Sequence, residues 1–206
     1  MLDGLSYHRR EEATYIVEVG MLTLIEDNKT FNYKIYRSSV VVEHQSEMID
    51  RINFAHQQLM KKYGSLNTDS TWLYKTYNIF SLIGPSKLFY ELFYDLTNVI
   101  KSTIVDKDFL WFQSWLNFHE PNEVLNWHNH HWYYHGYISI DPKKTKTIFK
   151  EYEILNQVGN IYIGPGNREH KVQVLRPYEG KRITLGFDVT TNEENPSDLI
   201  SLIPII

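Results

Sequence analysis

The 206-residue sequence contains no cysteine. A disulfide framework, a thiolate metal site and a thiol nucleophile are therefore excluded, and any metal must be held by nitrogen and oxygen atoms. Long hydrophobic runs are also missing. Residues 1–12 carry Asp3, Arg9 and Glu12 where a signal peptide would need a continuous apolar segment, and no later run approaches the length of a membrane span. We therefore expect a cytoplasmic protein without a membrane partner.

An excess of one charge is missing as well. The formal net charge is -4 and the isoelectric point is about 6.1. Neither value gives a general electrostatic reason to expect nucleic acid as a partner. The length suits one domain that buries most of its apolar surface, so we interpret residues 1–206 as a single domain.

The first half of the chain mixes strand and helix patterns. Apolar runs at 13–25 and at 31–36, the latter leading into 40–42, have strand chemistry, and the turn residues between them predict a hairpin. Helical spacing over 47–63 ends at Gly64, a residue typical of helix caps. After Pro85, apolar residues between Leu88 and Ile104 fall on one stripe, which predicts a second amphipathic helix with its stripe in the core.

From residue 109 onward the pattern changes to short strands separated by turns. Strands are predicted at 109–118, 127–131, 135–140, 145–149, 159–163, 171–175 and 182–189. Their number and short spacing indicate a mainly β fold with flanking helices, built as a sandwich or barrel rather than a parallel α/β sheet.

The segment 127–135 holds four of the nine histidines. Histidine is the commonest metal ligand, so this density suggests a metal site. In a strand, side chains two residues apart share a face, so His128 and His130 would point one way and His131 the other. An isolated pair of this kind is more often a pair of hydrogen-bonded surface imidazoles, and the metal hypothesis therefore depends on residues elsewhere in the chain.

Two later segments supply such residues. His170 follows a glycine- and proline-rich turn and begins a predicted strand, so it could return a third imidazole to the same face. In the strand 182–189, alternation places Arg182, Thr184 and Gly186 on the face opposite to three apolar residues. Arg182 is solvated if that face is external. If the face looks into the barrel, its buried guanidinium favours a bidentate carboxylate.

These residues carry a resemblance to a known family. His128-Asn-His130, His170 and Arg182-Ile-Thr184 resemble the motif series of the Fe(II)/2-oxoglutarate-dependent oxygenases, particularly those of marine bacteria and their phages. The resemblance covers about residues 109–188. It implies a double-stranded β-helix (jelly-roll) core and a dioxygenase that couples decarboxylation of 2-oxoglutarate to hydroxylation of a small molecule or peptide. The location would be the host cytoplasm if the gene is phage-encoded.

The resemblance also implies the site residues. The metal ligands for Fe(II) would be His128, His130 and His170, and the groups that bind 2-oxoglutarate would be Arg182, Thr184, Asn117 and Tyr137. His130 departs from the family pattern, because the usual facial triad has two histidines and one carboxylate. A histidine at this position makes the ligand set one charge more positive. On the same resemblance, residues 1–105 would pack on a jelly-roll core at 106–190, followed by a peripheral tail at 191–206.

Two alternatives stay open. Gly159-x5-Pro165-x4-His170 and His128-x-His130-x4-His135 are similar to the two cupin motifs, with His135 where the cupin glutamate ligand would stand. His135 is therefore a candidate fourth ligand, or a neighbour of the ligands. The cupin pattern does not account for Arg182 and Thr184, so we rank a cupin-type metal-binding protein second. The other alternative is a non-catalytic jelly-roll protein for binding or assembly.

Overall fold

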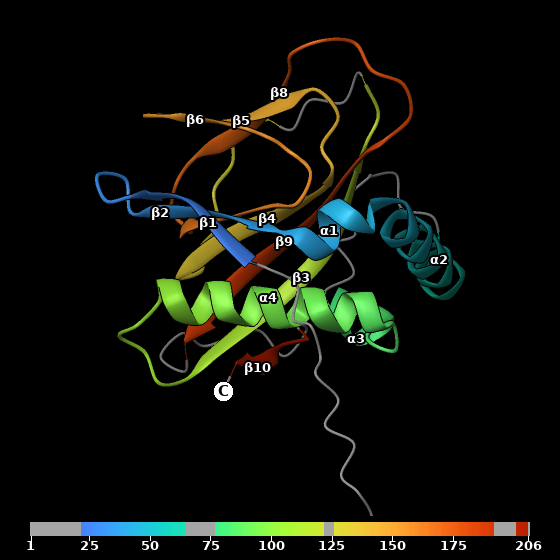
Figure 1. Ribbon diagram of the computed structural model, residues 1–206, viewed down its shortest axis with the longest axis horizontal. Helices are drawn as coiled ribbons and strands as arrows, with labels where there is room; N and C mark the ends of the chain where they lie inside the picture. The colour runs from blue at the N-terminus through green and yellow to red at the C-terminus, as the bar shows by residue number, and fades with distance from the viewer. Residues whose placement is uncertain (1–21, 65–76, 122–125, 192–200, 206) are drawn as a thin grey trace, which may run out of the picture.

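The computed structural model describes residues 22–64, 77–121, 126–191 and 201–205 of the chain. Two antiparallel sheets and four helices are stacked in layers: the smaller sheet, the larger sheet, and then the helices (Figure 1). Within the described residues, no helix is long and apolar enough to cross a membrane.

The larger sheet has seven strands in the order β1-β2-β7-β4-β9-β3-β10, all paired antiparallel. Their bounds are β1 Leu22–Asn28, β2 Tyr33–Ser38, β3 Leu110–His119, β4 Tyr134–Asp141, β7 Asn160–Pro165, β9 Arg182–Thr191 and β10 Ile203–Ile205. Strand β9 lies between β4 and β3, near the middle of the sheet. The predicted hairpin of the N-terminal half is confirmed as β1 and β2, although residues 13–21 lie outside the described residues.

The smaller sheet has three strands in the order β6-β5-β8. Their bounds are β5 Thr145–Phe149, β6 Glu153–Leu155 and β8 His170–Val174. The strand predicted at 127–131 is wrong, because only an isolated bridge joins His128 to His170 there. The backbone N–H of His130 donates instead to the carbonyl of Gly166, so the ladder does not continue along β8.

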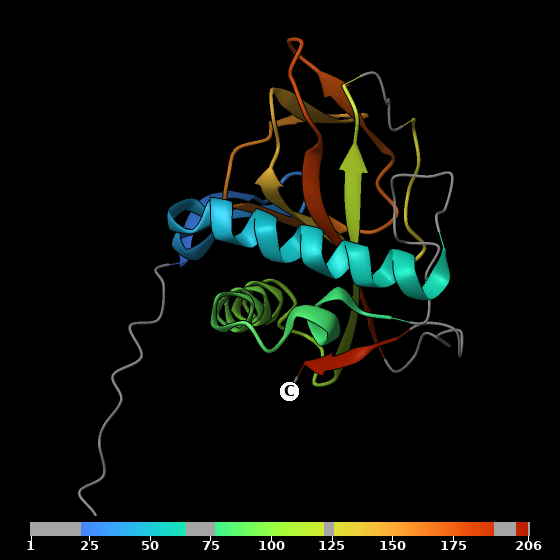
Figure 2. The same ribbon diagram turned by 90° about the vertical axis from the view of Figure 1, so that its right-hand side faces the viewer.

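Four helices cover the other face of the larger sheet (Figure 2). They are α1 Ser39–Glu43, α2 Gln45–Tyr63, α3 Ile79–Ile83 and α4 Lys87–Thr103. The apolar stripe of α4 is buried in the core that these helices form with the sheet. At the end of α2, Gly64 has φ +81° and its N–H donates to the carbonyl of Met60, so the predicted cap is confirmed.

Residues 40–42, predicted as a continuation of a strand, belong to helix α1. Val40 and Val41 are buried against the other helices, and this packing outweighs the strand preference of valine. Helix α3, with five residues, and strand β6, with three, were not predicted. The division at 1–105, 106–190 and 191–206 stays a prediction, but the larger sheet continues across both boundaries, because β2 pairs with β7 and β10 pairs with β3.

Gly136 provides a test of the packing that positions β4. A Cβ atom at this position would overlap the ring of Phe187 and the carbonyl oxygen of Tyr162. Because a backbone atom cannot move aside as a side chain can, Gly136→Ala should lower the free energy of unfolding by about 3 kcal/mol, measured by urea denaturation. Gly64→Ala is the control: it meets no atom within 4 Å and is strained only by its φ of +81°, so about 1 kcal/mol is expected. Equal losses in the two variants would contradict this packing argument.

Candidate metal centre

A pocket of about 260 Å³ opens between the two sheets. The larger sheet contributes side chains from β3, β4 and β9, and the smaller sheet contributes side chains from β5 and β8. All eight residues predicted for the site from the sequence line this pocket: His128, His130, His135, His170, Arg182, Thr184, Asn117 and Tyr137. The structure therefore brings together residues that are separated by up to 67 positions in the chain.

The four imidazoles of the pocket share one hydrogen-bonding pattern. His128 Nδ1 lies 2.8 Å from the carbonyl oxygen of Asn126, and His170 Nδ1 lies 3.0 Å from that of Arg168. A carbonyl oxygen can only accept, so both Nδ1 atoms carry the proton. The Nε2 atoms of these two rings consequently present lone pairs, the form in which imidazole binds a metal.

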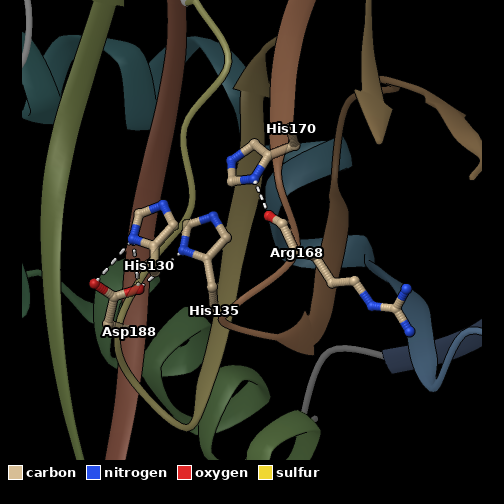
Figure 3. A network of polar contacts seen from close by, with 5 residues as sticks. All are labelled: His130, His135, Arg168, His170 and Asp188. Carbon is tan, nitrogen blue, oxygen red and sulfur yellow. Dashed lines mark hydrogen bonds and ion pairs between the residues drawn. The ribbon is translucent and has the colours of Figure 1, made fainter. Parts of the chain in front are cut away.

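The other two imidazoles are held by one carboxylate, that of Asp188. His135 Nδ1 lies 2.9 Å from Asp188 Oδ1, and His130 Nδ1 lies 3.2 Å from the other carboxylate oxygen, Oδ2 (Figure 3). An ionised carboxylate also only accepts, so these Nδ1 atoms donate as well. His130 Nε2 is buried and has no hydrogen-bond partner among the residues that the structure describes. A buried polar atom of this kind is costly unless something binds it, and a metal ion fits it.

Two overlapping groups of side chains could hold that ion. In the first, one ligand atom from each of His128, His130 and His170 lies within 4.8 Å of the others. In the second, His130, His135 and Asp188 meet the same distance limit. The second group is already joined by hydrogen bonds between its nitrogen and oxygen atoms, and Asp188 does not line the pocket. The first group is therefore the one that faces the pocket with free lone pairs.

Burial favours the neutral form of three of these imidazoles. It lowers the pKa of His170 to about 2, that of His135 to about 4, and that of His128 below its ordinary value; neighbouring histidines add to the shift for all three residues. Burial alone would raise the pKa of Asp188, but His130 and the hydrogen bonds from His130 and His135 lower it below the ordinary value. The site thus combines three imidazoles that burial keeps neutral with one buried anion.

Arg182 is a buried cation that lines the same pocket, with 3% of its surface exposed. Its Nε donates to Thr145 Oγ1 at 3.3 Å, and its Nη1 lies 3.3 Å from His119 Nδ1. Burial lowers its pKa to about 10, so it stays charged at neutral pH. In the described part of the chain, no carboxylate forms an ion pair with it. A buried charge without a partner is destabilising, and an anion bound in the pocket would supply the partner.

Sequence reasoning missed two of these residues, Asp188 and His119, and a signal in the sequence existed only for Asp188. The alternation that assigned Arg182, Thr184 and Gly186 to one face of β9 continues for one more step to Asp188. His119 lies directly opposite Arg182 in the pairing of β3 with β9. Its position could be found only once that register was known.

No protein-family model and no curated protein sequence matches the chain. Solved structures do. The chain is similar to the non-heme alpha-ketoglutarate-dependent carbocyclase SnoK from nogalamycin biosynthesis, with 8% identity over 85% of this chain and 96% of that chain, and a TM-score of 0.54. It is also similar to the non-heme alpha-ketoglutarate-dependent epimerase SnoN from the same biosynthesis, with 8% identity over 78% and 76% of the two chains and a TM-score of 0.50.

At this level of identity the likeness concerns the fold. It confirms the fold class predicted from the sequence, a mainly β jelly-roll with flanking helices. Both of those structures are of alpha-ketoglutarate-dependent enzymes. Alpha-ketoglutarate is another name for 2-oxoglutarate.

The neutral imidazoles generate a prediction about pH. Below about pH 6.5, the histidines of the unfolded chain take up protons, whereas folded His135 and His170 do so only near pH 4 and pH 2. The unfolded state therefore binds more protons, and stability that is fully present above pH 6.5 is lost as the pH falls. Each histidine should lower the free energy of unfolding of the metal-free protein by up to about 1.4 kcal/mol per pH unit.

Urea denaturation with a chelator present, repeated between pH 7.5 and pH 4.5, measures this slope. His135→Phe removes one of the two groups and should make the slope shallower. His131→Phe changes an exposed histidine and should leave the slope as it is. An unchanged slope in His135→Phe would contradict the assignment of His135 as a buried neutral imidazole.

Proposed function

We propose that this protein is an Fe(II)- and 2-oxoglutarate-dependent oxygenase that hydroxylates a small molecule or a peptide. One observation carries the proposal: three imidazole lone pairs line a single pocket together with a buried guanidinium that pairs with no carboxylate among the described residues. Imidazole nitrogen suits Fe(II), and a guanidinium fork suits a carboxylate. A dicarboxylic acid that reaches from the metal to Arg182 would use both.

His128, His130 and His170 would hold the iron through their Nε2 atoms, each kept free by the hydrogen bond at its own Nδ1. When bound, the iron supplies the redox chemistry that couples decarboxylation of 2-oxoglutarate to oxidation of a C–H bond. The protein contributes the position of the co-substrate relative to the metal.

Arg182 would bind the distal carboxylate of 2-oxoglutarate. Its guanidinium is already held in place by Thr145 and His119, so little conformational freedom is lost when the anion binds. Thr184 lies two residues further along β9 and also lines the pocket, as does Asn117, whose Nδ2 lies 3.5 Å from Thr184 Oγ1. These hydroxyl and amide groups would provide further hydrogen bonds to the co-substrate.

A cupin-type metal-binding protein is the second candidate. It is favoured by His135, which lines the pocket at the position where a cupin places its fourth ligand. This candidate predicts metal binding that does not depend on 2-oxoglutarate, and no role for Arg182. In either case we expect a cytoplasmic protein without a nucleic-acid partner.

Replacement of Arg182 tests the co-substrate site. Arg182→Gln removes the buried charge that we assign to the distal carboxylate, so the affinity for 2-oxoglutarate should fall by about 100-fold or more. Arg182→Lys keeps the charge without the planar fork and should lie between wild type and Arg182→Gln. Anaerobic isothermal titration calorimetry of the Fe(II)-loaded protein measures these affinities.

Arg51→Gln is the matched control, because Arg51 forms an exposed ion pair with Glu47 on α2. Its affinity for 2-oxoglutarate should equal that of wild type. If Arg182→Gln also binds 2-oxoglutarate as wild type does, Arg182 is not the anchor, and the cupin-type candidate takes precedence.

Turnover is tested by succinate release. Wild-type protein with Fe(II), oxygen and 2-oxoglutarate should release succinate, and His170→Ala, which lacks one proposed ligand, should not. The matching measurement is the iron-dependent binding of 2-oxoglutarate to both proteins without oxygen. If wild type binds no more 2-oxoglutarate in response to iron than His170→Ala does, the oxygenase proposal fails.

A further inference from the structure

In the described part of the chain, Asp188 is the one carboxylate that contacts the four imidazoles of the pocket. It is buried on β9, outside the lining of the pocket, and accepts hydrogen bonds from two imidazoles at once. Both bonds reach Nδ1 atoms, so both rings are held with the proton on Nδ1 and the lone pair on Nε2. One side chain thus sets the tautomer of His130 and of His135.

The two rings that Asp188 holds are stacked. Their centroids are 3.6 Å apart and their planes differ by 11°. Figure 3 shows them side by side, with one nitrogen of each directed to the carboxylate and the second nitrogens pointing in the same direction. Because the rings lie face to face at this short distance, their Nε2 lone pairs lie in two separate, nearly parallel planes and do not converge on one point.

This geometry excludes His135 from the set of metal ligands. A metal about 2.1 Å from an imidazole nitrogen lies close to the axis of that lone pair. For two stacked rings 3.6 Å apart, an ion at that distance from both nitrogens would lie far from both axes. Only one of the two rings can bind well. His130 meets His128 and His170 within 4.8 Å, and no group found with that limit joins His135 to those two.

We propose that His135 and Asp188 form a buried support behind the metal site, in which Asp188 positions His130 as a ligand while His135 stays outside the ligand set. His135 donates the second hydrogen bond to the carboxylate and stacks on His130, and both contacts restrict rotation of the His130 ring. The inference rests on the proposed function only in requiring a metal at His128, His130 and His170.

The support also accounts for the departure of His130 from the usual triad. A carboxylate ligand would place a negative charge on the metal directly. Here the charge of Asp188 lies one imidazole further away and reaches the metal through the hydrogen bond to His130 Nδ1. A carboxylate that accepts a hydrogen bond from a ligating imidazole makes that imidazole a stronger electron donor to the metal. The site therefore keeps a negative charge, but on Asp188 behind the ligand instead of on the ligand itself.

The variant Asp188→Asn tests whether the carboxylate sets the two tautomers, and the test needs no measurement of catalytic turnover. An amide has one accepting oxygen and one donating NH2 group, whereas His130 and His135 both need an acceptor. One of the two imidazoles must then accept at Nδ1 and move its proton to Nε2. In metal-free protein with 15N-labelled histidine, long-range 1H–15N correlation spectra should show Nδ1–H tautomers for both residues in wild type and one Nε2–H tautomer in Asp188→Asn.

Metal affinity is the second readout. With Co(II) as the probe, titrated against a competing chelator, Asp188→Asn should bind about 10–100-fold more weakly than wild type. Asp95→Asn is the control for loss of a buried carboxylate. Asp95 lies on α4 with a hydrogen bond from Ser38, away from the pocket, and its variant should bind Co(II) as wild type does.

A matched pair of variants decides the role of His135. His130→Phe and His135→Phe each keep an aromatic ring in the stack and remove one imidazole. His130→Phe should lower Co(II) affinity more than 100-fold, whereas His135→Phe should lower it less than about threefold and leave the tautomer of His130 unchanged. Circular dichroism and thermal unfolding establish that both variants are folded.

Two results would overturn the inference. Equal losses of Co(II) affinity in His130→Phe and His135→Phe would make His135 a ligand. Unchanged tautomers in Asp188→Asn would show that the carboxylate does not set them. If Asp188→Asn does not fold, the Phe pair still decides whether His135 is a ligand. Because Co(II) binding needs no 2-oxoglutarate, a protein that passes these tests but releases no succinate would contradict the oxygenase proposal alone.

Discussion

Strand β9 is the constraint on which the site depends. It pairs with β3 on one side and β4 on the other, and its alternate side chains form one wall of the pocket. The register places Thr184 opposite Asn117, and Gly186 opposite Trp115. Gly186 has to lack a side chain, because a Cβ atom would lie 2.6 Å from a ring atom of Trp115. A shift of one residue would turn this wall outward.

The same strand carries the two buried charges of the site. Arg182 and Asp188 lie six residues apart on one face of β9, and both are almost fully buried. They do not neutralise each other directly: the carboxylate is bound by His130 and His135, and the guanidinium contacts Thr145 and His119. The pocket is therefore polarised along the strand, with the Arg182 cation at one end and the Asp188 anion behind the imidazoles at the other. Such a field suits a ligand that binds the metal at one end and carries a carboxylate at the other.

Much of the architecture followed from local pattern. Alternation predicted β3, β5 and β9 nearly to the residue, and the apolar stripe predicted α4, because burial of one face imposes its period on the sequence. The errors have a different cause. Val40 and Val41 prefer strands in isolation but are buried among helices, and the segment after Trp127 is extended without a continuous ladder. In both cases contacts with distant residues outweighed local preference.

The sequence by itself determined which side chains carry the chemistry: histidines at 128, 130 and 170 without any cysteine, and an arginine two residues before a threonine on an alternating strand. It also determined the class of fold, since spacing and turns are local properties of the chain. Only the tertiary structure decided that Arg182 faces inward, that His135 stacks on His130, and that Asp188 holds both rings. Those facts depend on which strands are neighbours and in what register, and hydrogen bonds between residues 53 and 58 positions apart leave no periodic trace in a sequence.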